Sequence, residues 1–386
     1  MFTLNTKISI FKALITKRSP FYVQFFITKN CNLRCQMCNI VDSNKGQEDV
    51  SLEKIRDIAA NLRKIGAGIV LLTGGEPFFR RDVPEIVKIL KAEKLDVRLQ
   101  THGFRTNQEM LKECLRNGAV DINISLDTLD ESLQDSINQV PGSWRSALET
   151  ISFITRTFPE KDRLCAFGCV LSRHNYKEIP DIVRFASEIG WYVSVVPIHI
   201  TDATEGYNFR SRSRSLAFAP NQYDEVDMTI DHLISMRKQG FALFDSVPYL
   251  KSCKSFVRTG KPTWRDKNTG ICDSSGLYFA IRPNGAFAPC CDHDFTEPLF
   301  VYEKGFPEIY RSDLFKTKVK AITSQCVGCQ FGSYPEVTLS VRSRAAFLDH
   351  LKDAFFSKMN KKKAYSLDDL LAIIKRIRSE KPGEHR

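Results

Sequence analysis

The stretch Lys29-Asn-Cys31-Asn-Leu-Arg-Cys35-Gln-Met-Cys38-Asn39 decides the fold of this chain. It places three thiols within eight residues, directly after an apolar run over 22–28 that is typical of a strand. Three cysteines on one loop suit a 4Fe-4S cluster with one open iron, whereas zinc sites usually use two Cys-x-x-Cys pairs. The spacing therefore predicts a metal loop, with zinc as the alternative metal.

A second motif, Leu72-Thr73-Gly74-Gly75-Glu76-Pro77, stands where the next apolar run ends. Alone, its two glycines would be interpreted as a strand-ending turn. Together with the cysteine loop, the motif resembles the radical S-adenosylmethionine (radical SAM) enzymes over roughly residues 21–200. The resemblance implies that Cys31, Cys35 and Cys38 hold a 4Fe-4S cluster, at which S-adenosylmethionine is cleaved to a 5'-deoxyadenosyl radical.

The resemblance also implies contacts to the cofactor on both loops. Met37, just before the last cysteine of the loop, would lie beside the adenine. The segment Gly74, Gly75, Glu76 and Pro77 would bind the methionine amino group, since glycine lets the backbone approach closely.

Residues after three further strands complete the candidate site. Ser125-Leu-Asp127 resembles the family segment that contacts the ribose and methionine part of the cofactor; a polar strand end is an equal alternative. Arg173 would pair with the cofactor carboxylate, although it could equally be an ordinary loop residue. His102, at the end of the third strand, is a candidate substrate or cofactor contact.

The strand and helix order predicts a parallel sheet. Strands are expected near 22–28, 68–73, 95–101, 120–127, 163–171 and 191–199, and helices near 51–65, 82–93, 107–117, 143–157, 176–189 and 221–239. In the fourth strand, Ile122 and Ile124 alternate with Asp121, Asn123 and Ser125. The polar set should face a lumen, as the partial (β/α)6 TIM-like barrel of the family would provide.

A second cysteine group follows residue 240. Cys272 is followed by Gly285 and Cys290, and later by Cys326-Val-Gly-Cys329, a spacing that resembles the SPASM and Twitch auxiliary-cluster domains of radical SAM enzymes. A hairpin that turns at Pro283-Asn-Gly285 would bring Cys290 back toward Cys272. No cysteine follows Cys329, so we expect the Twitch form with one auxiliary 4Fe-4S cluster, or a zinc site with the same four thiols.

Two further cysteines and the tail carry separate expectations. Cys253 and Cys291 lie in or near the auxiliary domain, where either could be a spare ligand or a hydrogen-atom donor. The tail offers a helix start at Ser366 and an amphipathic pattern to about Arg378.

Composition and charge limit the function classes. The chain has 386 residues, 42% of them hydrophobic, enough for a sizeable core. Charged residues interrupt each apolar run before Pro20, so we expect no secretory signal and a reducing cytoplasm, where clustered thiols serve metals. No stretch approaches the ~18 apolar residues of a spanning helix, so no transmembrane segment is expected.

The net charge of +11 is dispersed along the chain, which favours a basic surface over a nucleic-acid-binding module. We therefore expect no nucleic-acid partner. In the segment Arg210-Ser-Arg212-Ser-Arg214, the three arginines are hypothesised to receive an anionic group of the substrate.

Residues 1–20 could form a short amphipathic helix with Ile8, Phe11 and Ile15 on one side. Packing of this helix against the barrel is favoured over a role at a membrane surface.

These expectations divide the chain into a basic segment (1–20), a radical SAM barrel (21–240), an auxiliary-cluster domain (241–345) and a helical tail (346–386).

The expected enzyme abstracts a hydrogen atom from a peptide or a small molecule such as a sugar. Oxidation follows, by dehydrogenation or cross-linking, with the auxiliary cluster as electron acceptor. An epimerase that uses Cys253 or Cys291 is the alternative, and a non-catalytic zinc or nucleic-acid-binding protein a distant one. A one-electron reductase such as flavodoxin or ferredoxin is the implied partner.

Overall fold

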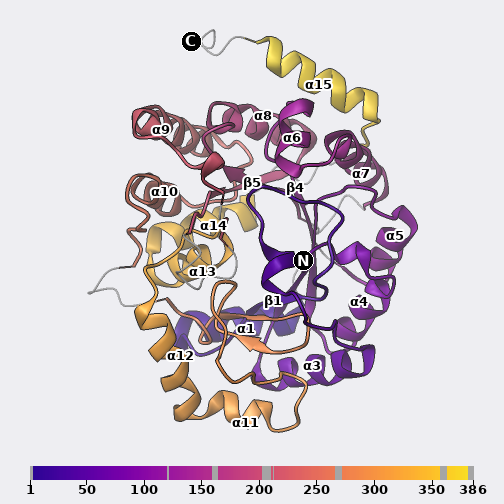
Figure 1. The fold of residues 1–386 in the computed structure, drawn as a ribbon, viewed down its shortest axis with the longest axis vertical. Helices are drawn as coiled ribbons and strands as arrows, with labels where there is room; N and C mark the ends of the chain where they lie inside the picture. Colours follow the sequence, from indigo (N-terminus) through magenta and orange to yellow (C-terminus); the bar gives the residue numbers. More distant parts are fainter. Residues whose placement is uncertain are drawn as a thin grey trace.

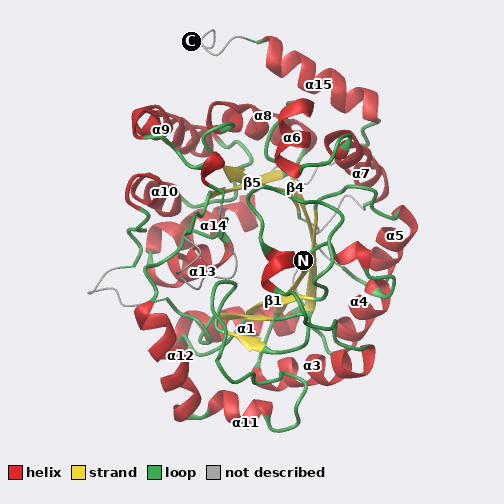
Figure 2. Ribbon diagram, viewed as in Figure 1, coloured by secondary structure: helices red, strands yellow, loops and turns green. Residues whose placement is uncertain are grey.

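One eight-stranded sheet organises the chain (Figures 1 and 2), in the order β6-β5-β4-β3-β2-β1-β7-β8. The computed structural model describes residues 3–119, 121–158, 164–201, 210–211, 213–265, 272–356 and 363–380. The strands are β1 (Tyr22–Phe26), β2 (Ile69–Thr73), β3 (Asp96–Thr101), β4 (Asp121–Ser125), β5 (Cys165–Leu171), β6 (Tyr192–Pro197), β7 (Tyr278–Ile281) and β8 (Phe287–Ala288).

Helices α3 to α12 form a ring around the strands, and Figure 1 shows α15 outside that ring. The helices of the first half are α1 (Leu4–Thr16), α2 (Ile40–Ser43), α3 (Leu52–Ile65), α4 (Val83–Ala92), α5 (Gln108–Arg116), α6 (Glu131–Asn138), α7 (Ser143–Thr157) and α8 (Ile179–Ile189). Those of the second half are α9 (Tyr223–Gln239), α10 (Val247–Thr259), α11 (Phe306–Arg311), α12 (Asp313–Gln325), α13 (Ser333–Arg342), α14 (Arg344–Phe356) and α15 (Leu367–Ser379). Short 3-10 helices are η1 (Pro77–Phe79), η2 (Tyr176–Glu178), η3 (Arg214–Leu216) and η4 (Pro220–Gln222).

The predicted parallel barrel is confirmed. Neighbouring strands from β6 through β1 to β7 run parallel, and β7 and β8 pair antiparallel. All six expected strands and all six expected helices are present, with ends that differ by a few residues. Val120, at the start of the fourth expected strand, lies outside the described residues.

The two faces of the sheet differ as the alternating pattern predicts. Ile122, Ile124 and Leu99 belong to the main core, on the side that the helices cover. Arg98 and Asn123, which are not part of this core, line a cavity of about 100 Å³ that Leu99 and Ile122 also border. The apolar side chains therefore hold the helices, which leaves a polar lumen.

The lumen is partly filled by the start of α13. Tyr334 Oη donates a hydrogen bond to Gln24 Oε1 at 2.6 Å, and the hydroxyls of Tyr22 and Ser333 are 3.1 Å apart. A Cβ at Gly332 would stand 3.1 Å from Ser194 Oγ on β6. A helix from the cysteine-rich part of the chain therefore sits inside the curve of the barrel sheet.

The part after residue 240 contains more regular structure than the sequence indicates. Helices α10 to α13 occupy much of a segment in which Pro, Gly, Trp and Cys suggested irregular chain. The expected hairpin is present as β7 and β8, and β7 pairs in parallel with β1, so this hairpin extends the barrel sheet.

The tail helix α15 is also confirmed, and Ser366 and Asp369 form its capping box. Arg376 makes an ion pair with Glu188 of α8, which fastens the helix to the outside of the barrel. Among the described residues, no helix has the length and apolar content needed to cross a membrane.

Candidate metal centres

The cysteine loop lies against the glycine loop, at the carboxyl ends of β1 and β2. The amide of Gly75 donates to Thr28 O at 2.9 Å, and that of Glu76 donates to Asn30 O at 2.7 Å. A Cβ at Gly75 would stand 2.1 Å from Asn30 O and 3.0 Å from Cys31 Cβ. Glycine is therefore required for the two loops to touch, a use of its small size that the sequence alone did not show.

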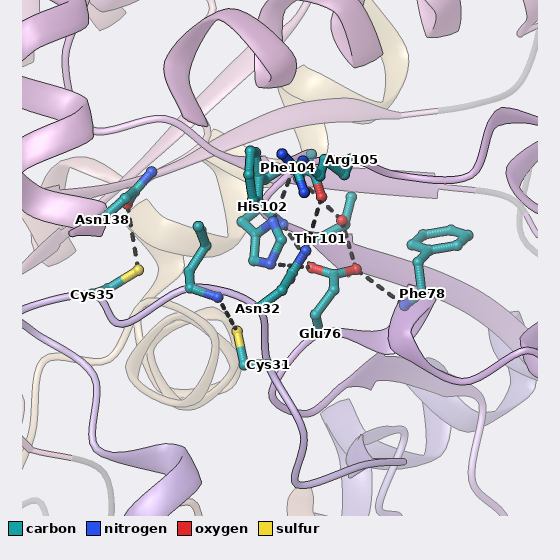
Figure 3. Close-up of polar contacts among 12 residues, drawn as sticks. Cys31, Asn32, Cys35, Glu76, Phe78, Thr101, His102, Phe104, Arg105 and Asn138 are labelled. Atoms are coloured by element: carbon teal, nitrogen blue, oxygen red, sulfur yellow. Dashed lines mark hydrogen bonds and ion pairs between the residues drawn. The ribbon is translucent and has the colours of Figure 1, made fainter. Parts of the chain in front are cut away.

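The carboxylate of Glu76 is buried and accepts three hydrogen bonds from the chain itself (Figure 3). Oε1 accepts from Thr101 Oγ1 at 2.8 Å and from the Phe78 amide at 3.1 Å. Oε2 accepts from the His102 amide at 3.1 Å and lies 3.2 Å from His102 Nε2. A carboxylate has about four acceptor positions. Glu76 therefore joins the ends of β2 and β3, and any contact with a ligand would fall to the backbone of its loop.

His102 is fixed in one orientation by two neighbours. The Phe104 amide donates to His102 Nδ1 at 3.0 Å, so the proton of the neutral ring is on Nε2, which faces Glu76. Figure 3 shows this ring beside the cysteine loop. His102 is thus part of the support of the glycine loop.

Helix α6 supports the cysteine loop from the other side. The amides of Arg34 and Gln36 donate to the carbonyls of Asn138 and Ile137 at 3.2 and 2.9 Å. The thiol of Cys35 donates to Asn138 Oδ1 at 3.4 Å (Figure 3). Helix α6 was not predicted from the sequence, although its N-cap Asp130, followed by Glu131, is a helix-start signal.

Asp127 connects to Cys35 through two amide side chains. Gln134 Nε2 donates to Asp127 Oδ2 at 3.1 Å and to Asn138 Oδ1 at 3.3 Å. Asp127 Oδ1 accepts from the Val170 amide at 2.7 Å. Burial raises the pKa of Asp127 to about 6, against the lowering effect of these hydrogen bonds. In this structure Asp127 joins β4, β5 and α6 behind the cysteine loop.

The other predicted cofactor contacts occupy different settings. Met37 is half-buried in the turn of the cysteine loop, and Pro77 is buried at the start of η1. Ser125 is half-buried at the end of β4. Arg173 is exposed, and its amide donates to Leu216 O at 3.2 Å.

The second cysteine group is assembled from three separate segments. Cys272 precedes β7, Cys290 follows β8, and Cys326 and Cys329 flank the turn after α12. The pKa of Cys290 is raised by burial and then by the charges of Asp292, Cys272, Cys329 and Cys326. Four thiols distant in sequence therefore lie within electrostatic reach of one another.

The three thiols of the first cysteine group also lie near one another. The pKa of Cys35 is raised by burial, then by the charge of Cys38, and more weakly by those of Asp127 and Cys31. Within the described residues, no three His, Cys, Asp or Glu side chains stand close enough to hold a metal ion in this conformation. The thiols of each group are thus neighbours whose side chains would have to turn toward a shared cluster.

The backbone N–H groups around the cysteine sulfurs show whether these thiols fit a cluster. A sulfur ligand is stabilised by N–H donors that point at it. Five of the seven candidate ligands have such a donor two residues further along the chain, which is a turn built around the sulfur. The pairs are Cys31 with Leu33, Cys38 with Ile40, Cys272 with Ser274, Cys326 with Gly328, and Cys329 with Phe331. Both groups therefore fit metal-bound thiolates.

Arg210 corrects one expectation. Instead of reaching for a substrate anion, its guanidinium is buried: Nε pairs with Asp292 Oδ2 at 2.9 Å and Nη2 donates to Gly328 O at 3.2 Å. It thus joins the chain after β6 to both halves of the second cysteine group. Arg212 lies outside the described residues, and Arg214 begins η3.

The two proposed hydrogen donors lie in different places. Cys253, on α10, is in the main core, and Gln330 Nε2 is 3.6 Å from its sulfur. Cys291 belongs to a second buried cluster that includes Phe26 and Tyr334, on the lumen side of the sheet. The two thiols are therefore buried on different sides of the sheet.

Sequence comparison finds similar proteins for the first half of the chain. Residues 25–186 match the Radical SAM superfamily. A probable GTP 3',8-cyclase of Pyrococcus horikoshii is 32% identical over 185 residues, covering 47% of this chain and 57% of that protein. A PqqA peptide cyclase of Bradyrhizobium diazoefficiens is 28% identical over 171 residues, covering 44% of each. The chain thus spans about half the length of these curated relatives.

Structural comparison extends further along the chain. The crystal structure of Streptococcus suis SuiB bound to the precursor peptide SuiA superposes with a TM-score of 0.58, covering 88% of this chain and 77% of SuiB. The sequences are 15% identical, so this likeness concerns the fold.

Proposed function

We propose that this chain belongs to the radical SAM superfamily, whose model residues 25–186 match, and that it is an enzyme whose Cys31, Cys35 and Cys38 hold a 4Fe-4S cluster with one open iron. A reduced cluster of this kind, with S-adenosylmethionine, supplies a carbon radical that removes a hydrogen atom from a substrate. The direct contact between the cysteine loop and the glycine loop is the observation that carries the proposal.

The residues of the chain would bind and orient the cofactor. The glycine loop offers its backbone next to Cys31, because Glu76 uses its carboxylate to fix that loop to β3. Met37 and Ser125 would border the cofactor from the cysteine loop and from β4. Arg173 is exposed and would have to turn inward to reach a carboxylate.

The second group would hold an auxiliary 4Fe-4S cluster on Cys272, Cys290, Cys326 and Cys329. A cluster with all four irons ligated cannot chelate a substrate, so its remaining use is to accept an electron. The backbone donors to three of these sulfurs support a cluster; zinc on the same thiols is the chemical alternative. We also propose that residues 241–345 form the auxiliary-cluster domain, between the barrel and the helical tail.

A peptide is the substrate class we favour. The PqqA peptide cyclase is a relative in sequence, and the likeness to SuiB, which was solved with a precursor peptide, covers 88% of this chain. A nucleotide is the competing class, because the Pyrococcus horikoshii relative is named for GTP. A sugar or another small molecule remains the third.

The proposed outcome is an oxidation, a dehydrogenation or a cross-link, in which the substrate loses a proton and passes an electron to the auxiliary site. The alternative is an epimerisation, which needs a hydrogen atom returned. The lumen-side position of Cys291 would then make it the donor in preference to Cys253.

The test is release of 5'-deoxyadenosine by protein reconstituted anaerobically with iron and sulfide, in the presence of dithionite and S-adenosylmethionine. We expect release from the wild type and loss of about 100-fold or more in Cys35→Ala, because a cluster needs its three thiolates. Cys114→Ala is the matched control, since Cys114 is buried on α5, away from both groups.

Undiminished release from Cys35→Ala would refute the assignment of the cysteine loop. Zinc in place of iron at both groups, with no release from the wild type, would favour the non-catalytic alternative. If a one-electron protein donor is the physiological partner, flavodoxin or ferredoxin with its reductase should support 5'-deoxyadenosine release in place of dithionite.

A further inference from the structure

Helix α1 packs against the barrel with its polar side. Thr6, Ser9 and Ala13 are its buried residues. Thr6 Oγ1 donates to Gly68 O at 2.8 Å, and Ser9 Oγ donates to Gly66 O at 2.7 Å. Hydrogen bonds to the chain between α3 and β2 therefore hold this helix, although its sequence is amphipathic.

The apolar side of α1 faces outward. Leu4, Ile8, Phe11 and Ile15 are 74%, 45%, 63% and 66% exposed. At about 100° per residue, these four side chains fall within an arc of about 60°, whose centre is about 160° from the buried set. Surface helices normally turn this side to the core. The expected packing of α1 against the barrel is confirmed, but it uses the polar side of the helix and leaves the apolar side exposed.

Positive charges border the apolar side. Lys7 and Lys12 are exposed, each about 40° beyond an edge of that arc. Lys17 and Arg18, also exposed, follow the helix. The first acidic residue of the chain is Asp42, so α1 itself carries no negative charge. An apolar strip between two cationic edges complements a surface that is apolar inside and anionic outside.

We propose that α1 binds the surface of an anionic lipid bilayer, lying in the plane of the membrane. Phe11 and its apolar neighbours would enter the boundary between headgroups and acyl chains. Lys7 and Lys12 would extend along the helix to the lipid phosphates. The net charge of +11 adds long-range attraction to the same surface.

The position of α1 agrees with this role. The Thr3 amide donates to Asp96 Oδ2 at 2.8 Å, where β3 begins, and Gly68 precedes β2. The helix therefore lies at the amino ends of the strands, whereas the cysteine loop lies at their carboxyl ends. A protein bound through α1 would keep its candidate site open to a substrate, whatever reaction that site performs.

The experiment is co-sedimentation of the full-length protein with vesicles of phosphatidylcholine, with or without phosphatidylglycerol. We expect binding only to the anionic vesicles, and a partition coefficient lowered about tenfold or more in Phe11→Ser/Ile15→Ser and in Lys7→Glu/Lys12→Glu. Leu314→Ser is the matched control, because Leu314 is 70% exposed on α12 and outside the strip.

Thermal melting and 5'-deoxyadenosine release should be unchanged in all three variants, which separates this proposal from the proposed reaction. Failure of the wild type to bind anionic vesicles overturns the proposal. So does a wild-type dimer that the Phe11→Ser/Ile15→Ser variant converts to monomer without any vesicle binding, because the strip would then join two copies of the chain.

Discussion

The two cysteine groups are brought together in opposite ways. The first has all three thiols on one loop of eight residues, held by the glycine loop on one side and by α6 on the other. The second takes Cys272, Cys290 and the Cys326–Cys329 turn from three segments, and depends on the fold to bring them together. A local group should tolerate distant changes, whereas an assembled group should be sensitive to each contact that aligns its parts.

The largest effect should come from removing half of the assembled group. We expect Cys326→Ala/Cys329→Ala to lower iron from about eight to about four per chain, since each cluster holds four irons. Product should be lost while uncoupled 5'-deoxyadenosine release continues, because the cysteine loop is intact. Iron analysis and product mass spectrometry measure this. Unchanged iron, or zinc at this site in the wild type, would remove the electron-acceptor role.

The next effect should come from the contact that holds the local group. In Gly75→Ala, the new Cβ would stand 2.1 Å from Asn30 O, so the backbone of one loop must move. We expect a loss of roughly 4 kcal/mol in the free energy of unfolding, together with loss of the first cluster. Gly305→Ala is the control, because Gly305 has a φ of −78° and nothing within 4 Å of a Cβ. Equal urea midpoints for the two variants would contradict this account of Gly75.

The assembled group should also fail when Arg210 is changed. Arg210→Met leaves Asp292 buried without this guanidinium, which should cost about 3 kcal/mol in the free energy of unfolding. We expect iron at the second group to fall while the first cluster remains. Restoration of much of the stability in Arg210→Met/Asp292→Leu would show that the cost comes from the buried Asp292 charge that has lost this guanidinium. A double variant as unstable as the sum of the singles would contradict this.

The smallest effect should be a pH dependence of stability that comes from Asp127, next to the first cysteine group. Burial raises the pKa of Asp127 to about 6, above its value of about 3.9 in the unfolded chain. The folded protein therefore keeps this proton up to a higher pH than the unfolded chain does. The free energy of unfolding should fall by about 2–3 kcal/mol as the pH rises from 4 to 6. Asp127→Asn should remove this part of the pH dependence in urea unfolding. An unaltered slope in the variant would show that Asp127 does not titrate in this range.

The sequence alone determined the parallel barrel, because hydrophobic periodicity and strand-helix alternation are local properties. Ile122 and Ile124 showed the covered face, and Asp121 and Asn123 the lumen. It also determined the cysteine loop, whose thiols need no distant residue to be neighbours. Gly285 placed the hairpin turn, because a positive φ of 86° favours glycine there.

Only the tertiary structure decided what lies behind those motifs. No local pattern indicates that Asn138 contacts Cys35, or that Arg210 pairs with Asp292, because these partners are 103 and 82 residues apart. The sequence also could not predict which side of α1 faces the barrel, because periodicity identifies an apolar side but not what that side contacts. That choice depends on Thr6 and Ser9 finding backbone carbonyls at Gly68 and Gly66, a balance of hydrogen bonds that exists only once the chain is folded.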